Sequence, residues 1–139
     1  MKDEQRLKIW PNKVPRSIRY PDMPLFGLLK KSAERHPNNP TIIFQDKGVT
    51  FKELDTLSDK FAAALHDMNV KKGDRVALFL ANIPEYILSY YGALKAGAAI
   101  TAMSPLFKER ELEYQLNNSG AETIVTLDSL YPLVKGIRK

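Results

Sequence analysis

The sequence predicts an α/β fold in which a parallel or mixed sheet carries helices on both faces. Residues 75–127 follow the order strand, helix, strand, helix, strand with short connections, which favours parallel strands and right-handed crossovers. The strand at 75–80 contains few polar residues, as expected of a strand covered on both sides. A helix, a hairpin and an amphipathic helix precede this unit. With 139 residues, the chain is long enough for one domain with a hydrophobic core.

Residues 1–24 are predicted to be an extended basic arm, because four prolines within them disfavour a helix. Residues 1–19 hold six bases and two acids, whereas the rest of the chain is nearly neutral. Such an arm can bind nucleic acid or anionic lipid. Its apolar residues are Ile9, Trp10, Val14, Ile18 and Tyr20. Because the bases are scattered among these apolar residues, we instead expect the arm to lie against a protein surface.

A helix and a hairpin follow the arm. Pro24 begins the helix, which we expect to run to about Arg35. Its inward face is predicted to consist of Leu25, Leu28, Leu29 and Ala33. The hairpin pairs Thr41–Phe44 with Val49–Phe51, and Asp46–Gly48 is the predicted turn between them.

The clearest helix of the sequence covers residues 51–68. Thr50 is its predicted N-cap, because Glu53 lies three residues further on, as in a capping box. Its apolar stripe is predicted to consist of Leu54, Leu57, Phe61, Leu65 and Met68. Asp55 and Asp59 lie off that stripe, and we interpret them as part of an exposed charged face.

The most apolar part of the chain begins at Asn82, which is a predicted helix N-cap. Pro84 suits the first turn of that helix, and Gly97 falls where a helix end favours a left-handed residue. Lys95 would lie near the negative end of the helix dipole. Ala98–Met103 then predicts a short buried strand. The helical part is too short to cross a bilayer, which requires about 20 apolar residues.

The last predicted elements are a helix, a strand and the beginning of another helix. The helix covers Lys108–Ser119 with Leu112 facing inward, and Gly120 is its expected C-cap. The strand is Thr123–Leu127, and Ser129 opens the further helix. Because the chain stops soon after this helix begins, we expect the sequence to be a truncated piece of a larger protein.

The residues contain no complete active site. The turn at 81–84 lacks glycine and includes a proline, so it offers no phosphate site. His36 and His66 have no partner at metal-ligand spacing. Ser89 shares a helix face with Gly92 and other small residues, which predicts close packing and not a nucleophile. The chain has no cysteine and no apolar leader, so we expect a cytoplasmic protein without a nucleic-acid partner or a transmembrane segment.

Five short motifs stand in order between about Tyr20 and Leu127. They are Val49-Thr-Phe-Lys-Glu-Leu54, Val70-Lys-Lys-Gly-Asp-Arg-Val76, Asn82-Ile-Pro-Glu-Tyr86, Leu94-Lys-Ala-Gly-Ala98 with Met103-Ser-Pro105, and Glu111-Leu-Glu-Tyr-Gln-Leu116 with Ser119-Gly-Ala121. In this order and at these distances they resemble the N-terminal part of AMP-forming acyl-CoA synthetases, within the adenylate-forming enzyme superfamily. Two positions depart from the family pattern, because Asn69 stands where glycine is usual and Ser104 replaces an asparagine.

The resemblance implies that residues 25–139 are an incomplete N-terminal α/β part of the large domain of such a ligase. It implies a reaction in which a carboxylic acid, here a fatty acid, attacks ATP to give an acyl-adenylate. The acyl group then passes to coenzyme A, with Mg²⁺ offsetting the phosphate charge. The family's catalytic motifs have no counterpart in this chain. We therefore assign no catalytic, cofactor-binding or metal-binding residue, and we expect the isolated segment to be inactive.

One residue and three alternatives stay open. Lys135 lies near the region where the family contacts coenzyme A, but no phosphate contact is assigned to it. Another adenylating enzyme, one that activates an aryl or amino acid, would fit the same resemblance. A stand-alone α/β interaction module with a basic arm is the alternative from a different class. The sequence also leaves open whether the chain forms a homodimer.

Overall fold

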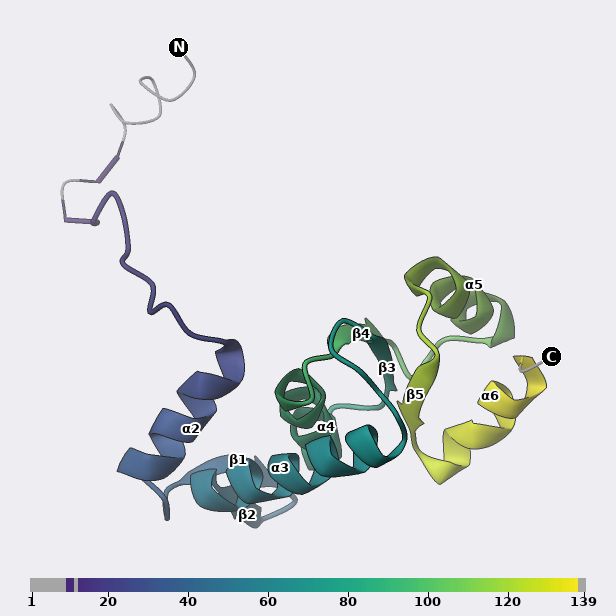
Figure 1. The fold of residues 1–139 in the computed structure, drawn as a ribbon, viewed down its shortest axis with the longest axis horizontal. Coiled ribbons are helices and arrows are strands. Elements are labelled where there is room, and N and C mark those ends of the chain that lie inside the picture. The colour runs from purple at the N-terminus through teal and green to yellow at the C-terminus, as the bar shows by residue number, and fades with distance from the viewer. Residues whose placement is uncertain (1–9, 12, 138–139) are drawn as a thin grey trace.

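The computed structural model describes residues 10–11 and 13–137 and confirms the α/β class (Figure 1). The helices are α2 (Leu25–Arg35), α3 (Phe51–Asp67), α4 (Pro84–Lys95), α5 (Glu109–Ser119) and α6 (Tyr131–Ile137). The strands are β1 (Pro40–Phe44), β2 (Lys47–Thr50), β3 (Arg75–Phe79), β4 (Ala99–Met103) and β5 (Thr123–Thr126). A short 3-10 turn at Asp128–Leu130 leads into α6. The predicted elements therefore occur in the predicted order.

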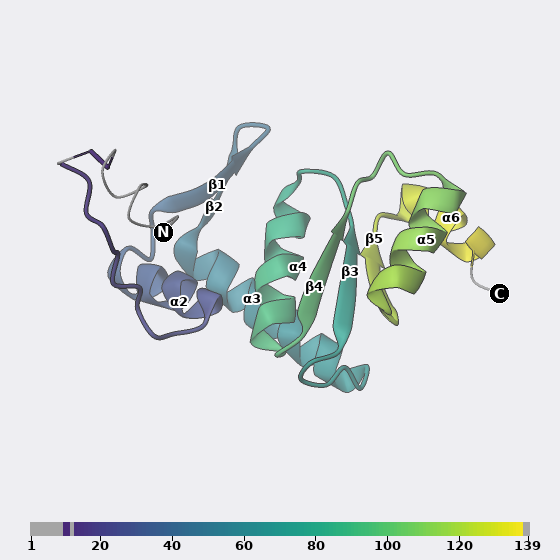
Figure 2. The same ribbon diagram turned by 90° about the horizontal axis from the view of Figure 1, so that it is seen from above.

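The strand β3 is the centre of a three-stranded parallel sheet with the order β4-β3-β5. Its first residue, Arg75, aligns with Ala99 of β4, and Val76 aligns with Thr123 of β5. The parallel sheet predicted from residues 75–127 is confirmed. The strands β1 and β2 form a separate antiparallel hairpin. Figure 2 shows α4 on one side of the parallel sheet and α5 with α6 on the other.

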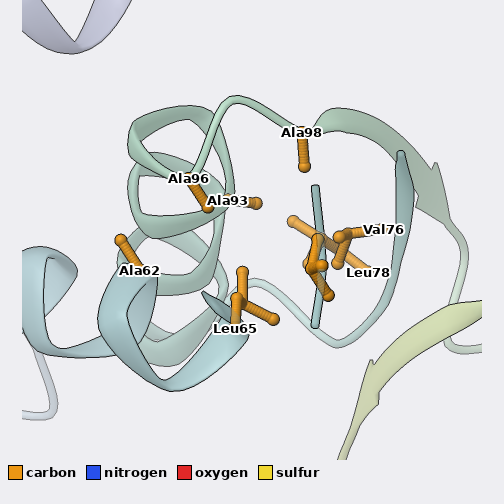
Figure 3. Packing of buried hydrophobic residues seen from close by; sticks show 8 residues of the cluster. Ala62, Leu65, Val76, Leu78, Ala93, Ala96 and Ala98 are labelled. Atoms are coloured by element: carbon orange, nitrogen blue, oxygen red, sulfur yellow. The ribbon is translucent and has the colours of Figure 1, made fainter. Parts of the chain in front are cut away.

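Alternate residues of β3 build two hydrophobic clusters, one on each face of the sheet, because neighbouring side chains of a strand point to opposite sides. Val76 and Leu78 pack with residues of α3 and α4, including Leu65 and Ala93 (Figure 3). On the opposite face, Ala77 and Phe79 pack with Met103, Leu112 and Val134 from β4, α5 and α6. The four β3 residues are fully buried. This double burial explains why β3 is an uninterrupted apolar run.

The predicted start of α3 is confirmed in detail. The Thr50 hydroxyl oxygen accepts a hydrogen bond from the backbone N–H of Glu53 at 3.2 Å. The Glu53 carboxylate accepts one from the backbone N–H of Thr50 at 2.8 Å. This reciprocal pair satisfies two backbone donors that the first turn of a helix leaves unpaired. The capping box therefore fixes where the hairpin ends and α3 begins.

The buried face of α3 differs from the predicted stripe. The residues that are buried are Leu54, Ser58, Ala62 and Leu65. Leu57 and Met68, which were expected to face inward, are exposed, so the prediction was wrong for these two. The reason is close packing of α3 against α4, which brings small residues into the contact and turns the large side chains at the rim of the stripe toward solvent. The prediction was wrong in the same way for Leu25 and Leu28 of α2, where only Leu29 is buried.

Two predicted boundaries were wrong by one or two residues. Asn82 is not the N-cap of α4, since the cap position is Ile83 and Asn82 lies exposed in the preceding loop. A proline at the first helical position has no N–H that needs capping, so the helix begins well without a polar cap. The hairpin turn is Gln45-Asp46, and both residues have positive φ angles, as two-residue hairpin turns favour. Lys47 and Gly48 belong to β2 instead.

The glycine positions of two helix ends are confirmed. Gly97 follows the last residues of α4 with a φ angle of 81°, and Gly120 is the C-cap of α5 with a φ angle of 64°. Both angles lie in the left-handed region, which only glycine adopts without strain. Each glycine lets the chain leave its helix and turn directly into the next strand of the parallel sheet.

The described part of the arm, residues 10–11 and 13–24, contains no helix or strand and extends away from the sheet (Figures 1 and 2). Trp10, Val14, Ile18 and Tyr20 are all exposed, so the body of this chain is not the protein surface on which we expected them to lie. Ile9 lies outside the described residues. Within the described residues, no helix combines the length and the apolar character that crossing a membrane requires.

Candidate functional site

The carboxyl ends of the parallel strands are the first place to look for a site, because open α/β sheets bind ligands there, at the point where the strand order reverses. In this sheet that point lies between β3 and β5. Two of the polar groups beside it close local turns. The Ser104 hydroxyl accepts the backbone N–H of Leu106 at 3.3 Å, and Asp128 Oδ1 accepts that of Ser129 at 2.7 Å. These two groups are already engaged in turns, whereas the hydroxyl of Thr126, the last residue of β5, has no hydrogen-bond partner among the described residues.

The start of α4 is unsuited to an anion. It opens on a proline, which supplies no N–H, and its first turn contains Glu85. A carboxylate there occupies the positive end of the helix dipole that would otherwise attract a phosphate. The residues at this crevice therefore offer neither the backbone donors nor the charge that a nucleotide phosphate requires.

The two histidines lie far apart in the fold. His36 caps the end of α2 and His66 lies in the last turn of α3, and both are exposed. Over residues 10–11 and 13–137, no group of three or more histidine, aspartate or glutamate side chains could hold a metal ion. The described residues thus hold no preformed cage of metal ligands, although Mg²⁺ is commonly held by one or two carboxylates together with water and substrate phosphates.

The most concentrated charge cluster joins α3 to α4, and sequence reasoning missed it. The Lys95 ammonium donates to Asp55 Oδ1 at 2.6 Å, to the Asp55 backbone oxygen at 2.8 Å and to Asp59 Oδ1 at 2.7 Å. The Lys95 side chain is 9% exposed and that of Asp55 is 22% exposed. Asp55 was expected on a solvated charged face, and this interpretation was wrong because Lys95 covers it. Asp59 remains 66% exposed.

This cluster is built to hold two helices together and not to perform chemistry. An ammonium group has three N–H donors, and all three have acceptors here. A lysine in this state has no free electron pair to act as a nucleophile or base. Each of the two carboxylates gives one oxygen to Lys95. We therefore interpret the cluster as a structural clamp, Lys95–Asp55–Asp59.

The small-residue face predicted on α4 is confirmed as a close-packing surface next to this clamp. A Cβ atom placed on Gly92 would lie 2.6 Å from Cδ1 of Phe61 and 3.0 Å from the backbone oxygen of Ser58. Ser89 is buried in the same helix. The Ser58 hydroxyl donates to the backbone oxygen of Asp55 at 2.9 Å, the same oxygen that Lys95 binds. Close packing and the clamp thus share one contact region.

A groove with a volume of about 400 Å³ lies between α5, β5 and α6. Lys135 lines it, together with the carboxylate residues Glu113 and Glu122. The hydroxyl oxygen of Thr126, another lining residue, is buried without a hydrogen-bond partner among the described residues. Since two carboxylates share the groove with one exposed lysine, its charge does not favour a phosphate. The coenzyme A contact considered for Lys135 gains no support from this geometry.

Comparison with known proteins identifies the family. The model of the family described as "AMP-binding enzyme" matches residues 29–138. The chain is 42% identical over 123 residues to the long-chain-fatty-acid–CoA ligase of Bacillus subtilis, an alignment that covers 88% of this chain and 22% of that protein. The match to the family model spans most of the chain, which therefore belongs to the AMP-binding enzyme family.

Solved structures agree with this assignment. The N-terminal domain of FACL13 from Mycobacterium tuberculosis is 27% identical, with a TM-score of 0.77 over 84% of this chain and 30% of that one. The anthranilate CoA ligase AuaEII, solved in complex with anthranoyl-AMP, shares the fold with a TM-score of 0.79 at 24% identity, over 84% of this chain and 22% of that protein. The present chain thus spans about a fifth of the length of the Bacillus subtilis relative.

Proposed function

We propose that this chain is the N-terminal scaffold portion of an ATP-dependent acid–CoA ligase. The observation that carries the proposal is its 42% identity, over 88% of the chain, to a protein named long-chain-fatty-acid–CoA ligase. The agreement in fold with the N-terminal domain of FACL13 supports an N-terminal position of this chain within the ligase. In the proposed reaction, a carboxylic acid becomes an acyl-adenylate at the expense of ATP, and the acyl group passes to coenzyme A.

The scaffold role follows from what the described side chains already do. Lys95 is held by Asp55 and Asp59, and Ser104 and Asp128 at the strand ends close turns. Among the described residues, no group of three or more acidic or histidine side chains could hold a metal ion. We therefore propose that ATP, Mg²⁺, coenzyme A and the acid bind residues of the ligase that this chain does not contain, and that the ligase works in the cytoplasm.

A fatty acid is the proposed substrate class, supported by the names of two relatives with 42% and 35% identity. An aryl or amino acid is the alternative. Because the acid is proposed to bind outside this chain, formation of acyl-CoA from palmitate, benzoate and an amino acid by the full-length ligase decides between them. A chimera tests the scaffold role instead: residues 20–137 replace the aligned segment of the Bacillus subtilis ligase, and formation of acyl-CoA is measured with the same three acids. A chimera that carries its packing contacts intact should retain palmitate-dependent activity within about tenfold of the unaltered ligase, since a tenfold loss corresponds to about 1.4 kcal/mol of transition-state stabilisation.

The control for this experiment is the same chimera with Gly92→Leu. Even a Cβ atom placed on Gly92 would lie 2.6 Å from Cδ1 of Phe61, so a leucine side chain does not fit there. This variant should yield less folded protein, and its activity should fall with the amount of folded protein. A full-length ligase that activates benzoate or an amino acid but not palmitate would overturn the fatty-acid assignment. A folded chimera with no activity on any acid would contradict the scaffold role itself.

A further inference from the structure

The strand β5 lies at an edge of the parallel sheet, although its composition is that of an interior strand. Among the described residues it pairs with β3 on one side and with no strand on the other. The four residues of β5, Thr123–Thr126, are all half-buried, whereas residues 76–79 of β3 are fully buried. β5 carries no charge, no proline and no bulge, the features with which proteins commonly protect an edge that stays exposed to water. The free edge of β5 is therefore open to a further strand.

The end of β5 also contains an unsatisfied polar group. The hydroxyl oxygen of Thr126, the last residue of the strand, is buried without a hydrogen-bond partner among the described residues. Thr126 lines the groove between α5, β5 and α6, together with Ile124 of the same strand. A buried polar group without a partner costs free energy, so native structures almost always supply one. We therefore expect the partner of Thr126 to come from outside the described residues.

The connections of the sheet indicate on which side the next strand belongs. From β3 to β4 the chain passes through α4 on one face of the sheet. From β4 to β5 it passes through α5 on the other face and moves in the opposite direction across the sheet (Figure 2). Reversing both the face and the direction preserves handedness, and such crossovers are right-handed in nearly all proteins. The helix α6 follows β5 on the same face as α5. A right-handed crossover through α6 therefore leads past β5 to its free edge.

We propose that the free edge of β5 binds, in trans, a parallel strand of a ligase that lacks this segment. The inference rests on the proposed function and deepens it, because it makes the scaffold a separable subunit that holds the catalytic remainder by noncovalent contacts. The alignment with the Bacillus subtilis ligase covers 22% of that protein, so most of such a ligase lies outside the aligned part. A strand from that remainder would pair with the backbone N–H and C=O groups of β5 that point away from β3. Contacts beside the end of that strand would supply the partner of Thr126.

Other partners fit this edge less well. A lipid bilayer offers no hydrogen bonds to the free backbone groups of a strand edge, and open sheet edges do not occur in its apolar part. Nucleic acid would bring phosphates toward Glu113 and Glu122, the carboxylate residues of the adjacent groove. A second copy of this chain related by a two-fold axis would present its β5 in the antiparallel direction, whereas the crossover through α6 favours a parallel neighbour.

Co-expression tests the proposal with the whole chain. The 139-residue chain is produced together with a tagged Bacillus subtilis ligase from which the aligned segment has been deleted, and the complex is purified on the tag. We expect both chains to be recovered in equal amounts. Hydrogen exchange over seconds, a time during which paired amides stay protected, is then measured by mass spectrometry for the free and the bound chain. Residues 123–126 should exchange at least about tenfold more slowly in the complex. Residues 76–79 of β3, which are already paired on both sides, should not change.

Two substitutions at Thr126 test whether the edge of β5 is the contact. Thr126→Lys places a charge where an incoming strand would bury it without a partner, and it should weaken the complex at least about a hundredfold. Thr126→Val is the matched control, since it keeps the shape of the side chain and removes only the hydroxyl, and it should bind within about fivefold of the unaltered chain. Circular dichroism checks that both variants fold. Equal binding by the two variants would place the contact elsewhere on the chain.

Three further results would overturn the proposal, and they use the unaltered chain, so they decide it even where a lysine destabilises β5. The first is a failure of the chain to co-purify with the tagged ligase. If the covalent chimera with residues 20–137 is active, this failure leaves the scaffold role standing and only the binding in trans is wrong. The second is a complex in which residues 123–126 exchange as fast as in the free chain. The third is slower exchange of these residues in the free chain as its concentration rises, which would assign the edge to a second copy.

Discussion

The ammonium of Lys95, at the end of α4, lies 2.6 Å from a carboxylate oxygen of Asp55 on α3. The two residues are 40 positions apart in the sequence, and the contact is shielded from solvent on the lysine side. It anchors the last turn of α4 directly before Gly97 turns the chain into β4. The ion pair thereby couples the packing of two helices to the placement of an edge strand of the parallel sheet.

Replacement of Lys95 by methionine should destabilise the chain by about 1–3 kcal/mol, because Asp55 then loses its charged partner in a half-buried position. The measurement is the urea midpoint of unfolding, followed by circular dichroism. Lys60→Met, at an exposed position of the same helix pair, is the matched control and should change the free energy of unfolding by less than about 0.5 kcal/mol. Equal midpoints for the two variants would mean that the clamp does not stabilise the fold.

Gly92→Ala should destabilise the chain by about 1–3 kcal/mol, although alanine favours a helix more than glycine does. The added Cβ would lie 2.6 Å from Phe61 Cδ1, and the backbone oxygen of Ser58 at 3.0 Å limits any relief. Gly27→Ala in α2 is the control, because its nearest contact is the flexible Met23 at 3.4 Å. This variant should be neutral or up to about 1 kcal/mol more stable, as thermal unfolding will reveal.

The capping box at Thr50 predicts a pH dependence for the start of α3. Hydrogen bonds from the backbone and the side chain of Thr50 lower the pKa of Glu53 below its ordinary value of 4.5. The carboxylate is therefore favoured in the folded state, and its stabilisation is present above pH 4.5 and lost as the pH falls through the lowered pKa. Glu53→Gln keeps an acceptor oxygen but cannot titrate.

The difference in unfolding free energy between the native chain and Glu53→Gln should consequently be constant near neutral pH and shrink in acid. Urea titrations at several pH values below 6 measure it. A difference that grows as the pH falls would have the wrong sign for a lowered pKa and would rule out the capping-box contribution.

Asn69→Gly should stabilise the chain by a few tenths to about 1 kcal/mol. Asn69 has a φ angle of 65°, in the left-handed region, where the chain leaves α3. Asparagine tolerates this conformation but glycine does so without strain, and glycine is the residue that the related ligase motif carries here. Asn69→Ala should act in the opposite direction. A melting temperature that falls for the glycine variant and rises for the alanine variant would contradict this account.

The sequence pattern predicted the elements of the parallel sheet well because their signals are local. The apolar run at β3, the capping box at Thr50 and the glycines at 97 and 120 each reflect the chemistry of neighbouring residues. The errors arose where the decisive partner is distant. Leu57 was expected inside, but α4 packs on the small side chains of α3 and leaves it exposed.

The clamp illustrates the same limit for the candidate site. The sequence showed Asp55 and Asp59 four residues apart. It also showed a single base at the end of an apolar helix. Nothing local indicated that they meet, because the contact depends on how α4 crosses α3. The resemblance to acyl-CoA synthetases had a different basis, since it rests on the order and spacing of whole motifs, and the family match over residues 29–138 confirmed it.

The central claim is that this chain provides scaffold for a ligase whose chemistry lies in other residues. ATP–pyrophosphate exchange by the purified 139-residue chain tests it most directly, with palmitate, Mg²⁺ and radiolabelled pyrophosphate present and the intact Bacillus subtilis ligase as the positive control. We predict exchange no greater than that of a sample without protein. Palmitate-dependent exchange by this chain, lost on heat denaturation, would contradict the claim and place a complete adenylating site within these residues.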